Sequence, residues 1–304
     1  MSTKYVITLI NRSEDPLTDS EVQRLLLKVV AHIPSDIETE FTSLKRLGDR
    51  AVDQYLTTSA SIDKTMLQDV SQDVDLILQI DDQYRQDKKL FVFDMDSTLI
   101  YQEVIELIAS YAQVEPQVKL ITDRAMNNEI DFKESLRERV ALLKGLPIET
   151  IYDEVKGKLK VTRGVPELCQ FLHKKGIKLA VLSGGFVPFA QYIQETLGLD
   201  YMRANELEID NDGKLTGKVN GEIVDGEVKA ESILTLIDKW SLAIEETVMV
   251  GDGGNDLPAM SVAGFGIAWN AKPRVQAEAP CQLNTKSMLD ILYILGYTDE
   301  EMKH

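Results

Sequence analysis

Cysteine is nearly absent from this 304-residue sequence: Cys169 and Cys281 are the only two, and they lie far apart. This scarcity excludes a disulfide-stapled fold and a cysteine-rich zinc site. No apolar run approaches the roughly 20 residues of a membrane-spanning helix. The opening segment MSTKYVITLINRSED lacks both the apolar core of a signal peptide and the arginine-rich character of a transit peptide. We therefore expect a cytoplasmic protein without a membrane partner.

Positive charge is also scarce, because 33 Lys and Arg residues face 50 Asp and Glu residues, for a formal net charge of −17. A nucleic-acid-binding protein would show a basic face, so no nucleic-acid partner is expected. A small phosphorylated anion is compatible with this acidity only where a few cationic side chains, backbone N–H groups or a metal ion reverse the field locally.

Several catalytic motifs are missing. Neither cysteine has an arginine six residues later, which excludes a cysteine-phosphatase loop. No GxxxxGK[ST] segment occurs, which excludes a P-loop nucleotide-binding site. The three histidines do not stand in a phosphohistidine-type setting; they are His32, His173 and His304.

The first 85 residues predict a small α+β unit. A strand at 4–10 precedes a helix at about 19–31, which the capping-box pair Thr18 and Glu21 introduces. An extended segment runs to about 47, and a turn at Gly48-Asp49 leads from it into a further strand through AVDQYLT. A short helix then carries Ile62, Met66, Leu67 and Val70 on one side, and a last strand spans 74–80. This order, β-α-β-β-α-β, is that of a ferredoxin-like domain, which we expect to be regulatory or dimerising.

A polar connector at 81–89 leads into a segment of different character, expected to form one domain over 86–304. Four apolar runs of strand length alternate with amphipathic helices, at 90–93, 178–182, 247–250 and 264–269. Such runs are typical of strands covered on both faces, so the pattern predicts an α/β fold with a doubly wound parallel sheet.

Polar clusters follow three of these strands: Asp94–Thr98, Ser183–Gly185 and Gly251–Asp256. The carboxyl ends of parallel strands share one edge of the sheet, where ligands bind, so the clusters should converge. Asp94 and Asp252 could then hold Mg²⁺, although aspartates in such turns also cap helices. Lys229 lies in the first turn of a predicted helix capped by Asp225, where the helix dipole disfavours a cation. It is either a solvated surface lysine or the partner of an anion.

Together, FDMDSTL, LSGG, Lys229 and GDGGND resemble the four motifs of the haloacid dehalogenase superfamily of phosphohydrolases, in the same order and spacing. The segments YQEVIELIASYA, RAMNNEIDFKESLRERV and GDGGNDLPAM resemble the branch that acts on O-phospho-L-serine, across residues 88–280. The N-terminal unit resembles, by topology alone, the ACT-like domain of some members.

The resemblance implies a Mg²⁺-dependent phosphomonoesterase that forms an aspartyl-phosphate and releases L-serine, the last step of serine biosynthesis. Asp94 would be the nucleophile, and Asp96 would protonate the leaving oxygen and then activate water. Asp94, Asp252 and the carbonyl of Asp96 would hold the metal ion. The phosphoryl group would be bound by Ser183, Gly184, Lys229 and Asn255, and Asp256 would orient Lys229 or support the metal site.

The insertion at about 101–165 predicts a small helical cap that selects the substrate. On its helix 132–143, Arg139 falls on the same side as the apolar stripe, so it requires a carboxylate partner. That partner is either a glutamate of the cap or, as the resemblance implies, the substrate α-carboxylate. Glu103 would then bind the ammonium group, and Met126 and Phe132 would close over the ligand. A hairpin flap is expected at about 205–225, from the turn Asn211-Asp212-Gly213.

Two alternatives remain open at this point. The chain could hydrolyse another small phosphometabolite, which Glu103 and Arg139 argue against. It could also be a phospho-accepting sensor of amino acids, with Asp94 as a receiver-type aspartate, which Asp96 and Lys229 argue against. A homodimer is compatible with either.

Overall fold

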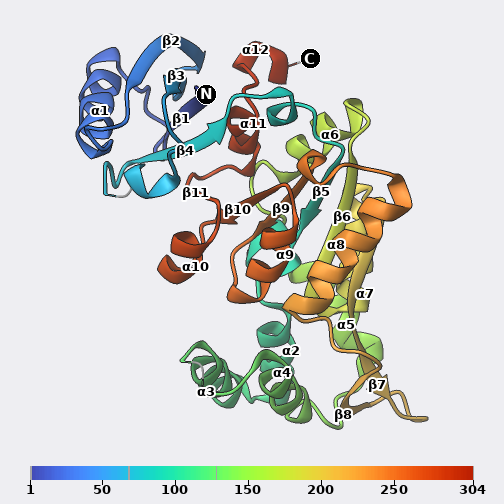
Figure 1. Ribbon diagram of the computed structural model, residues 1–304. Coiled ribbons are helices and arrows are strands. Elements are labelled where there is room, and N and C mark those ends of the chain that lie inside the picture. Colours follow the sequence, from blue (N-terminus) through green and yellow to red (C-terminus); the bar gives the residue numbers. More distant parts are fainter. Residues whose placement is uncertain (1, 68, 128, 304) are drawn as a thin grey trace.

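The computed structural model describes residues 2–67, 69–127 and 129–303, with only the backbone of Met126 and Thr150. Two sheets organise the chain (Figure 1). The N-terminal sheet contains β1 (Thr3–Asn11), β2 (Thr39–Gly48), β3 (Ala51–Thr58) and β4 (Val74–Ile80), paired antiparallel in the order β2-β3-β1-β4. This is the strand order of a ferredoxin-like unit, as the sequence predicts.

Helix α1 (Asp19–His32) covers one face of this sheet. The predicted capping box is present, with Thr18 accepting from the backbone N–H of Glu21. Val22, Leu25 and Val29 are buried against the strands. The predicted short helix is present as a 3₁₀ helix of one turn, η1 (Lys64–Leu67). The Asp63 carboxylate binds the N–H and hydroxyl of Thr65 at its start, and Asp69 adopts a left-handed conformation, with φ of 59°, just after it.

The larger sheet has seven strands in the order β11-β10-β9-β5-β6-β7-β8. Its strands are β5 (Leu90–Phe93), β6 (Lys178–Phe186), β7 (Tyr201–Ile209), β8 (Leu215–Asn220), β9 (Thr247–Gly251), β10 (Phe265–Trp269) and β11 (Cys281–Leu283). All neighbours are parallel except β7 and β8, which form the predicted hairpin. The four predicted strands are present, and β7, β8 and β11 extend the sheet beyond them.

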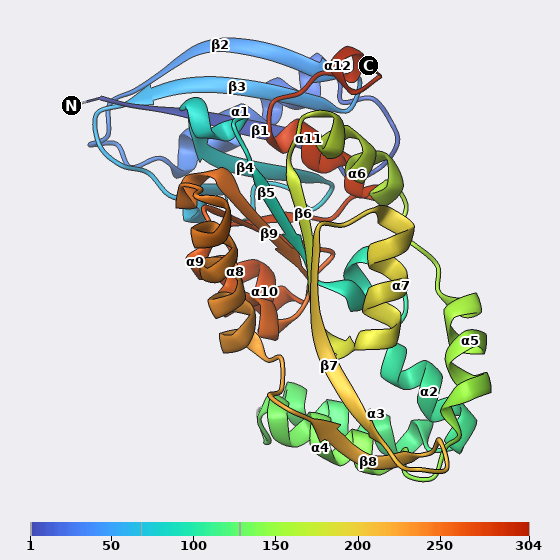
Figure 2. The same ribbon diagram turned by 90° about the vertical axis from the view of Figure 1, so that its right-hand side faces the viewer.

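Helices cover both faces of this sheet, as a doubly wound fold requires (Figure 2). Phe91, Phe93 and Val181 pack on the side of α6 (Val165–Lys174) and α7 (Val187–Leu197). Val92, Leu182 and Met249 face the other side, with α8 (Gly226–Trp240) and α9 (Leu257–Val262). The remaining helices of this part are α10 (Pro273–Glu278), α11 (Ile291–Ile294) and α12 (Asp299–Met302).

The insertion after β5 forms the expected helical cap. It consists of α2 (Val104–Ala112), α3 (Glu115–Met126), α4 (Phe132–Ala141) and α5 (Ile148–Lys158). The β7–β8 hairpin lies beside it, since the Gly145 N–H donates to Leu215 O at 2.7 Å and Ile148 N–H to Gly213 O at 3.1 Å. The cap and hairpin occupy the end of the molecule opposite the N-terminal sheet (Figures 1 and 2).

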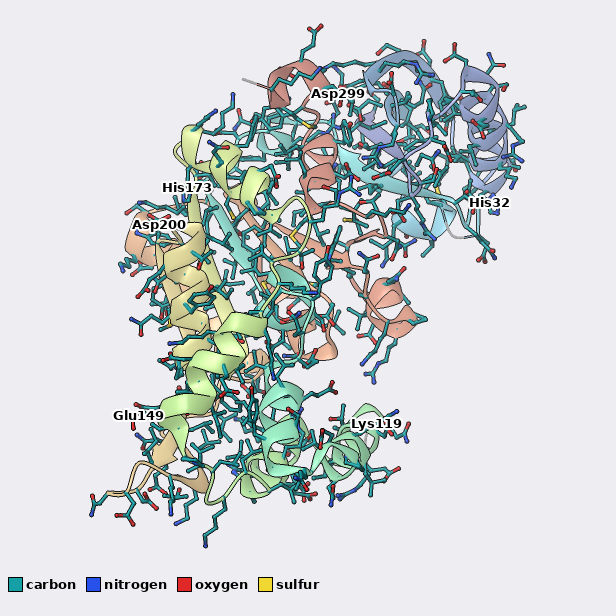
Figure 3. The ribbon with its side chains drawn as sticks, turned by 180° about the vertical axis from the view of Figure 1, so that it is seen from behind. His32, Lys119, Glu149, His173, Asp200 and Asp299 are labelled. Atoms are coloured by element: carbon teal, nitrogen blue, oxygen red, sulfur yellow. The ribbon has the colours of Figure 1, made fainter. Side chains whose placement is uncertain are left out.

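The N-terminal sheet packs directly on the C-terminal part of the chain. Its second face contributes Ile10, Leu47 and Ile77 to the main core. The connector at 81–89 is more than a solvated linker, because Arg85 is only 6% exposed. Its guanidinium holds both oxygens of Asp53 at 2.8 Å and donates to Ile294 O at 3.1 Å. Figure 3 shows Asp299 of α12 beside the same sheet, where its carboxylate lies against Gly48.

No helix within the described ranges is long and apolar enough to span a bilayer.

Candidate functional site

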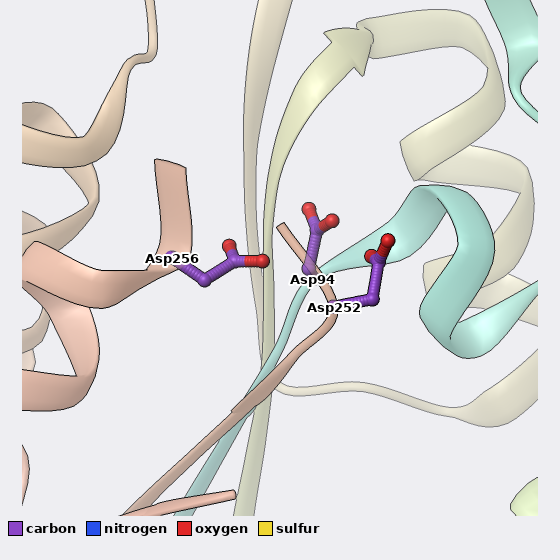
Figure 4. A group of neighbouring side chains, drawn as sticks. All are labelled: Asp94, Asp252 and Asp256. Atoms are coloured by element: carbon purple, nitrogen blue, oxygen red, sulfur yellow. The ribbon is translucent and has the colours of Figure 1, made fainter. Parts of the chain in front are cut away.

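The polar clusters that follow β5, β6 and β9 converge at the carboxyl edge of the larger sheet. Asp94 comes directly after β5, and its N–H continues the ladder by donating to Val250 O at 2.9 Å. Asp252 comes directly after β9. Figure 4 shows Asp94 between Asp252 and Asp256, and one carboxylate oxygen of each lies within 4.8 Å of the others. This edge is therefore strongly anionic.

Lys229 enters this cluster from α8. The Asp225 side chain caps the helix by accepting from Val228 N–H at 3.0 Å, so Lys229 lies in the first turn. The lysine is fully buried, and its ammonium donates to Asp94 Oδ1 and Asp256 Oδ1, both at 2.7 Å. Burial alone would lower the pKa of Lys229, but the two carboxylates outweigh burial and raise it. The alternative of a solvated surface lysine is therefore wrong.

One lysine does not neutralise three carboxylates. Burial, and then the charge of Asp256, raises the pKa of Asp94 to about 7 against the opposing effect of Lys229. Burial, followed by the charges of Asp94 and Asp256, raises the pKa of Asp252 well above its ordinary value. Thr98 Oγ1 donates a hydrogen bond to Asp252 Oδ1 at 3.1 Å. Oxygen ligands with excess negative charge are the donor set that a hard divalent cation requires.

Asp96 lies two residues after Asp94, in the irregular turn η3 (Met95–Leu99). Its Oδ1 is buried and has no hydrogen-bond partner in the described part of the chain. Burial, then the charges of Glu103 and Asp94, raises the pKa of this carboxyl well above its ordinary value. Ser97 has a φ of 56°, a left-handed conformation that costs energy for a residue other than glycine and is common at functional sites. A carboxyl in this setting favours the protonated form and can donate a proton.

Ser183 and Gly184 are placed differently from the prediction. They belong to the irregular end of β6, whose register with β7 shifts between Leu182 and Phe186, and α7 begins only at Val187. The sequence predicts these residues just after the strand, whereas in the structure the strand continues past them to Phe186. A Cβ on Gly184 would lie 2.7 Å from Phe132 Cζ and 3.6 Å from Asn255 Nδ2. A side chain at this position would displace the Phe132 ring of the cap.

Two contacts that the sequence did not reveal fix this strand end. The Ser183 hydroxyl accepts from Gly185 N–H at 2.9 Å. Asn205, fully buried on β7, donates to Gly184 O at 2.8 Å and accepts from Val224 N–H at 2.8 Å. Its only sequence signal is an uncharged polar residue ahead of the hairpin. Thr98, bound to Asp252, was also missed, although it belongs to the FDMDSTL segment.

The cap brings Glu103 and Arg139 toward the same site. Glu103 precedes α2 and accepts from Ser97 Oγ at 2.7 Å. Arg139 is half-buried on α4, and its Nε donates to Ser135 O at 3.2 Å. Burial lowers the pKa of Arg139, opposed by the charges of Glu103, Asp96 and Glu106. Within the described residues Arg139 makes no ion pair, so the alternative of a glutamate partner in the cap receives no support there.

Four of the residues singled out from the sequence form one cluster. Lys229 contacts Asp94 and Asp256 directly, and Asp252 lies beside them. Phe132 and Asn255 lie against Gly184. The side chain of Met126 lies outside the described residues.

The chain is similar to several known proteins. Residues 88–264 match the family model "haloacid dehalogenase-like hydrolase". The chain is 58% identical to the phosphoserine phosphatase of Saccharomyces cerevisiae over 307 residues, covering 99% of this chain and 98% of that protein.

Two solved structures are also similar, each 41% identical with a TM-score of 0.64. One is a phospho-aspartyl intermediate analogue of a phosphoserine phosphatase, matched over 68% of this chain and 98% of its own. The other is a substrate-bound phosphoserine phosphatase complex, matched over 68% of this chain and 97% of its own.

Proposed function

The chain belongs to the phosphoserine phosphatases of the haloacid dehalogenase-like hydrolases, and from this premise we propose how its own residues divide the reaction. It hydrolyses O-phosphoserine to serine and phosphate through an aspartyl-phosphate. The observation that carries the assignment of residues is the buried contact of Lys229 with Asp94 and Asp256 beside Asp252. These comparisons do not support the two alternative functions, a phospho-accepting sensor or a phosphatase of another small metabolite.

Asp94 is the nucleophile in this proposal. Lys229 occupies its Oδ1, which leaves Oδ2 to attack phosphorus while the bond from phosphorus to the serine oxygen breaks. The raised pKa of Asp96 suits it to give its proton to the leaving serine oxygen. Asp96 then takes a proton from the water that cleaves the aspartyl-phosphate, which restores both carboxyl groups.

The phosphoryl oxygens face the end of β6. Lys229 supplies a buried positive charge, and Ser183, Gly184 and Asn255 supply hydrogen-bond donors around the same point. Asn205 fixes the Gly184 carbonyl, so the neighbouring N–H groups are held in place before the substrate arrives. Such preorganised donors stabilise the charge that develops during phosphoryl transfer.

Members of this family use a metal ion, and we propose Mg²⁺ here. Its ligands would be Asp94, Asp252 and the carbonyl of Asp96, while Asp256 is already engaged by Lys229 and by Gly253 N–H at 3.0 Å. The excess negative charge of the three carboxylates fits a hard cation. When bound, the ion supplies charge neutralisation between an anionic nucleophile and an anionic substrate.

Glu103 and Arg139 are proposed to recognise the amino and carboxylate groups of serine, with Phe132 and Met126 closing the site. The absence of an ion-pair partner for Arg139 among the described residues supports this role, because a half-buried guanidinium needs an anion.

For the N-terminal unit, 1–85, we propose an ACT-like regulatory or dimerising domain, supported by its ferredoxin-like strand order. We also propose a cytoplasmic location, supported by Cys169 and Cys281 both being free and buried.

The test is phosphate release from O-phospho-L-serine, phosphoethanolamine and an aryl phosphate, each with and without Mg²⁺. Mg²⁺-dependent release that favours phosphoserine is the expected result. Release from the aryl ester alone would keep the nucleophile but overturn the roles of Glu103 and Arg139. Equal rates after thorough chelation would overturn the metal site.

A further inference from the structure

An ion pair joins the cap to the body of the molecule above the catalytic site. Lys133 Nζ of α4 lies 3.0 Å from Asp225 Oδ2, the capping residue of α8. Figure 2 shows the start of α8 and the linker before it reaching down to the cap beside α4. The two partners are 92 positions apart in sequence, so the contact exists only while the cap lies on the body.

The ion pair joins the first turns of α4 and α8, and residues on both helices belong to the catalytic site. Phe132, one residue before Lys133, lies on Gly184, and Arg139 follows on the same helix. On the other side, Lys229 lies one turn after Asp225 and contacts Asp94. A shift of α4 away from α8 would therefore move Phe132 and Arg139 away from the phosphate-binding edge together.

Neither helix needs this contact for its own formation. A lysine in the first turn of α4 is unfavourable to the helix dipole, so Lys133 does not stabilise its own helix. Asp225 caps α8 with Oδ1, which binds Val228 N–H, and uses Oδ2 for Lys133. The two oxygens of Asp225 therefore make separate contacts. The ion pair with Lys133 can be removed while the hydrogen bond at the N-terminus of α8 is kept.

The pair is accessible to water and salt. The Lys133 side chain is 38% exposed and that of Asp225 14%. Lys133 also lines a groove of about 650 Å³ between α4, β8 and the following linker, together with Arg137, Lys218 and Glu222. An ion pair of this exposure makes a small contribution to stability, and salt screens it.

We propose that the Lys133–Asp225 ion pair is a positioning contact that holds α4 over the bound substrate and so sets the apparent affinity for phosphoserine. This inference rests on the proposed function of the site. In the proposed reaction Lys133 contacts no reacting atom. It acts only by positioning Phe132 and Arg139.

The test uses Lys133→Gln, Asp225→Asn and the double variant. Asparagine caps helices as well as aspartate does, so Asp225→Asn removes the charge and keeps the fold. We expect each single variant to raise KM for phosphoserine about threefold, the double variant to add nothing further, and kcat to change less than about twofold. In the unsubstituted protein, about 0.5 M NaCl should raise KM to the same level, while the variants should respond much less.

Two controls separate positioning from a general structural effect. Lys133→Arg should retain the unsubstituted KM, because it keeps the charge. Arg124→Gln removes an ion pair with Glu138 that joins α3 and α4 inside the cap at 2.6 Å, with side chains 37% and 36% exposed, and KM should not change. Hydrogen exchange gives a readout independent of turnover: amides of α4 should exchange faster in Lys133→Gln, and those of α1 should not.

An unchanged KM in both single variants of an active enzyme, or effects that add in the double variant, would overturn the positioning role. Loss of phosphoserine hydrolysis is a different result: an inactive unsubstituted protein would contradict the proposed function. Even then, unchanged exchange in α4 would overturn the contact, and faster exchange would support it.

Discussion

Lys229 and Asp256 form an ion pair in which neither side chain is exposed to solvent. The contact, 2.7 Å long, holds the ammonium where it also reaches Asp94 at the same distance. Asp256 itself is fixed by Gly253 N–H. Burying a charge costs free energy unless the charge is paired. The two carboxylates therefore make it possible to bury the Lys229 ammonium at the edge of the sheet.

Replacing the central carboxylate should separate catalysis from stability. Asp94→Asn keeps the Oδ1 acceptor for Lys229 but removes the nucleophile, so turnover of phosphoserine should fall by more than about a thousandfold. The change also relieves repulsion with Asp252 and Asp256. The free energy of unfolding of the metal-free protein should therefore stay constant or rise by about 1 kcal/mol. Urea unfolding and phosphate release measure the two effects, and near-native turnover would contradict the mechanism.

Truncating Arg139 should reveal substrate discrimination. Arg139→Ala removes the guanidinium proposed to bind the α-carboxylate, so kcat/KM for phosphoserine should fall about 100-fold. Phosphoethanolamine has the ammonium group but no carboxylate, so its kcat/KM should fall by less than about threefold. Arg137→Ala, on the exposed side of the same helix, is the control and should leave both values unchanged. Equal losses on the two substrates would remove Arg139 from carboxylate recognition.

The catalytic edge is largely predictable from the sequence because its signals are local. Strands covered on both faces must be apolar throughout, so LFVF and TVMV mark β5 and β9, and the aspartates after them must share one edge. The first-turn position of Lys229 follows from Asp225 in the same way.

The contacts that depend on distant partners are not predictable in this manner. Arg85 lies in a stretch of charged residues typical of a solvated linker, and its burial is explained by distant acceptors, Asp53 on β3 and the carbonyl of Ile294. Asn205 is a single polar residue in a strand, and its structural role depends on the hydrogen bond that it donates to the Gly184 carbonyl. In both cases the partner is set by tertiary packing, for which periodicity carries no signal.

The Arg85–Asp53 pair should stabilise the union of the two sheets. Arg85→Met keeps the long side chain but leaves the Asp53 carboxylate, fully buried, without its bidentate cation. We expect the free energy of unfolding to fall by about 3 kcal/mol or more. Arg46→Met removes a pair with Asp19 that is 39% and 84% exposed, and should cost less than about 1 kcal/mol. Similar losses from the two variants, measured by urea unfolding, would show that burial does not set the contribution of Arg85.

Burial of Lys88 should make the free energy of unfolding depend on pH in the alkaline range. It is 5% exposed, and its ammonium donates to Glu245 O at 2.7 Å. Burial lowers the pKa of Lys88 to about 8, against the opposing charges of Asp82 and Glu245, whereas the ordinary value is 10.5. Between these two values the unfolded chain holds a proton that the folded protein has released, so the free energy of unfolding should rise with pH by up to about 3 kcal/mol. Below the folded pKa both states are protonated, and this contribution is constant.

Lys88→Met isolates this effect, because methionine fills a similar volume and does not titrate. The difference in free energy of unfolding between the unsubstituted protein and this variant should be flat below about pH 7 and should increase in favour of lysine toward about pH 10. Taking the difference cancels the titration of the tyrosines and of the other lysines, which both proteins share. A difference that stays constant across this range would show that the folded protein solvates the ammonium as well as water does.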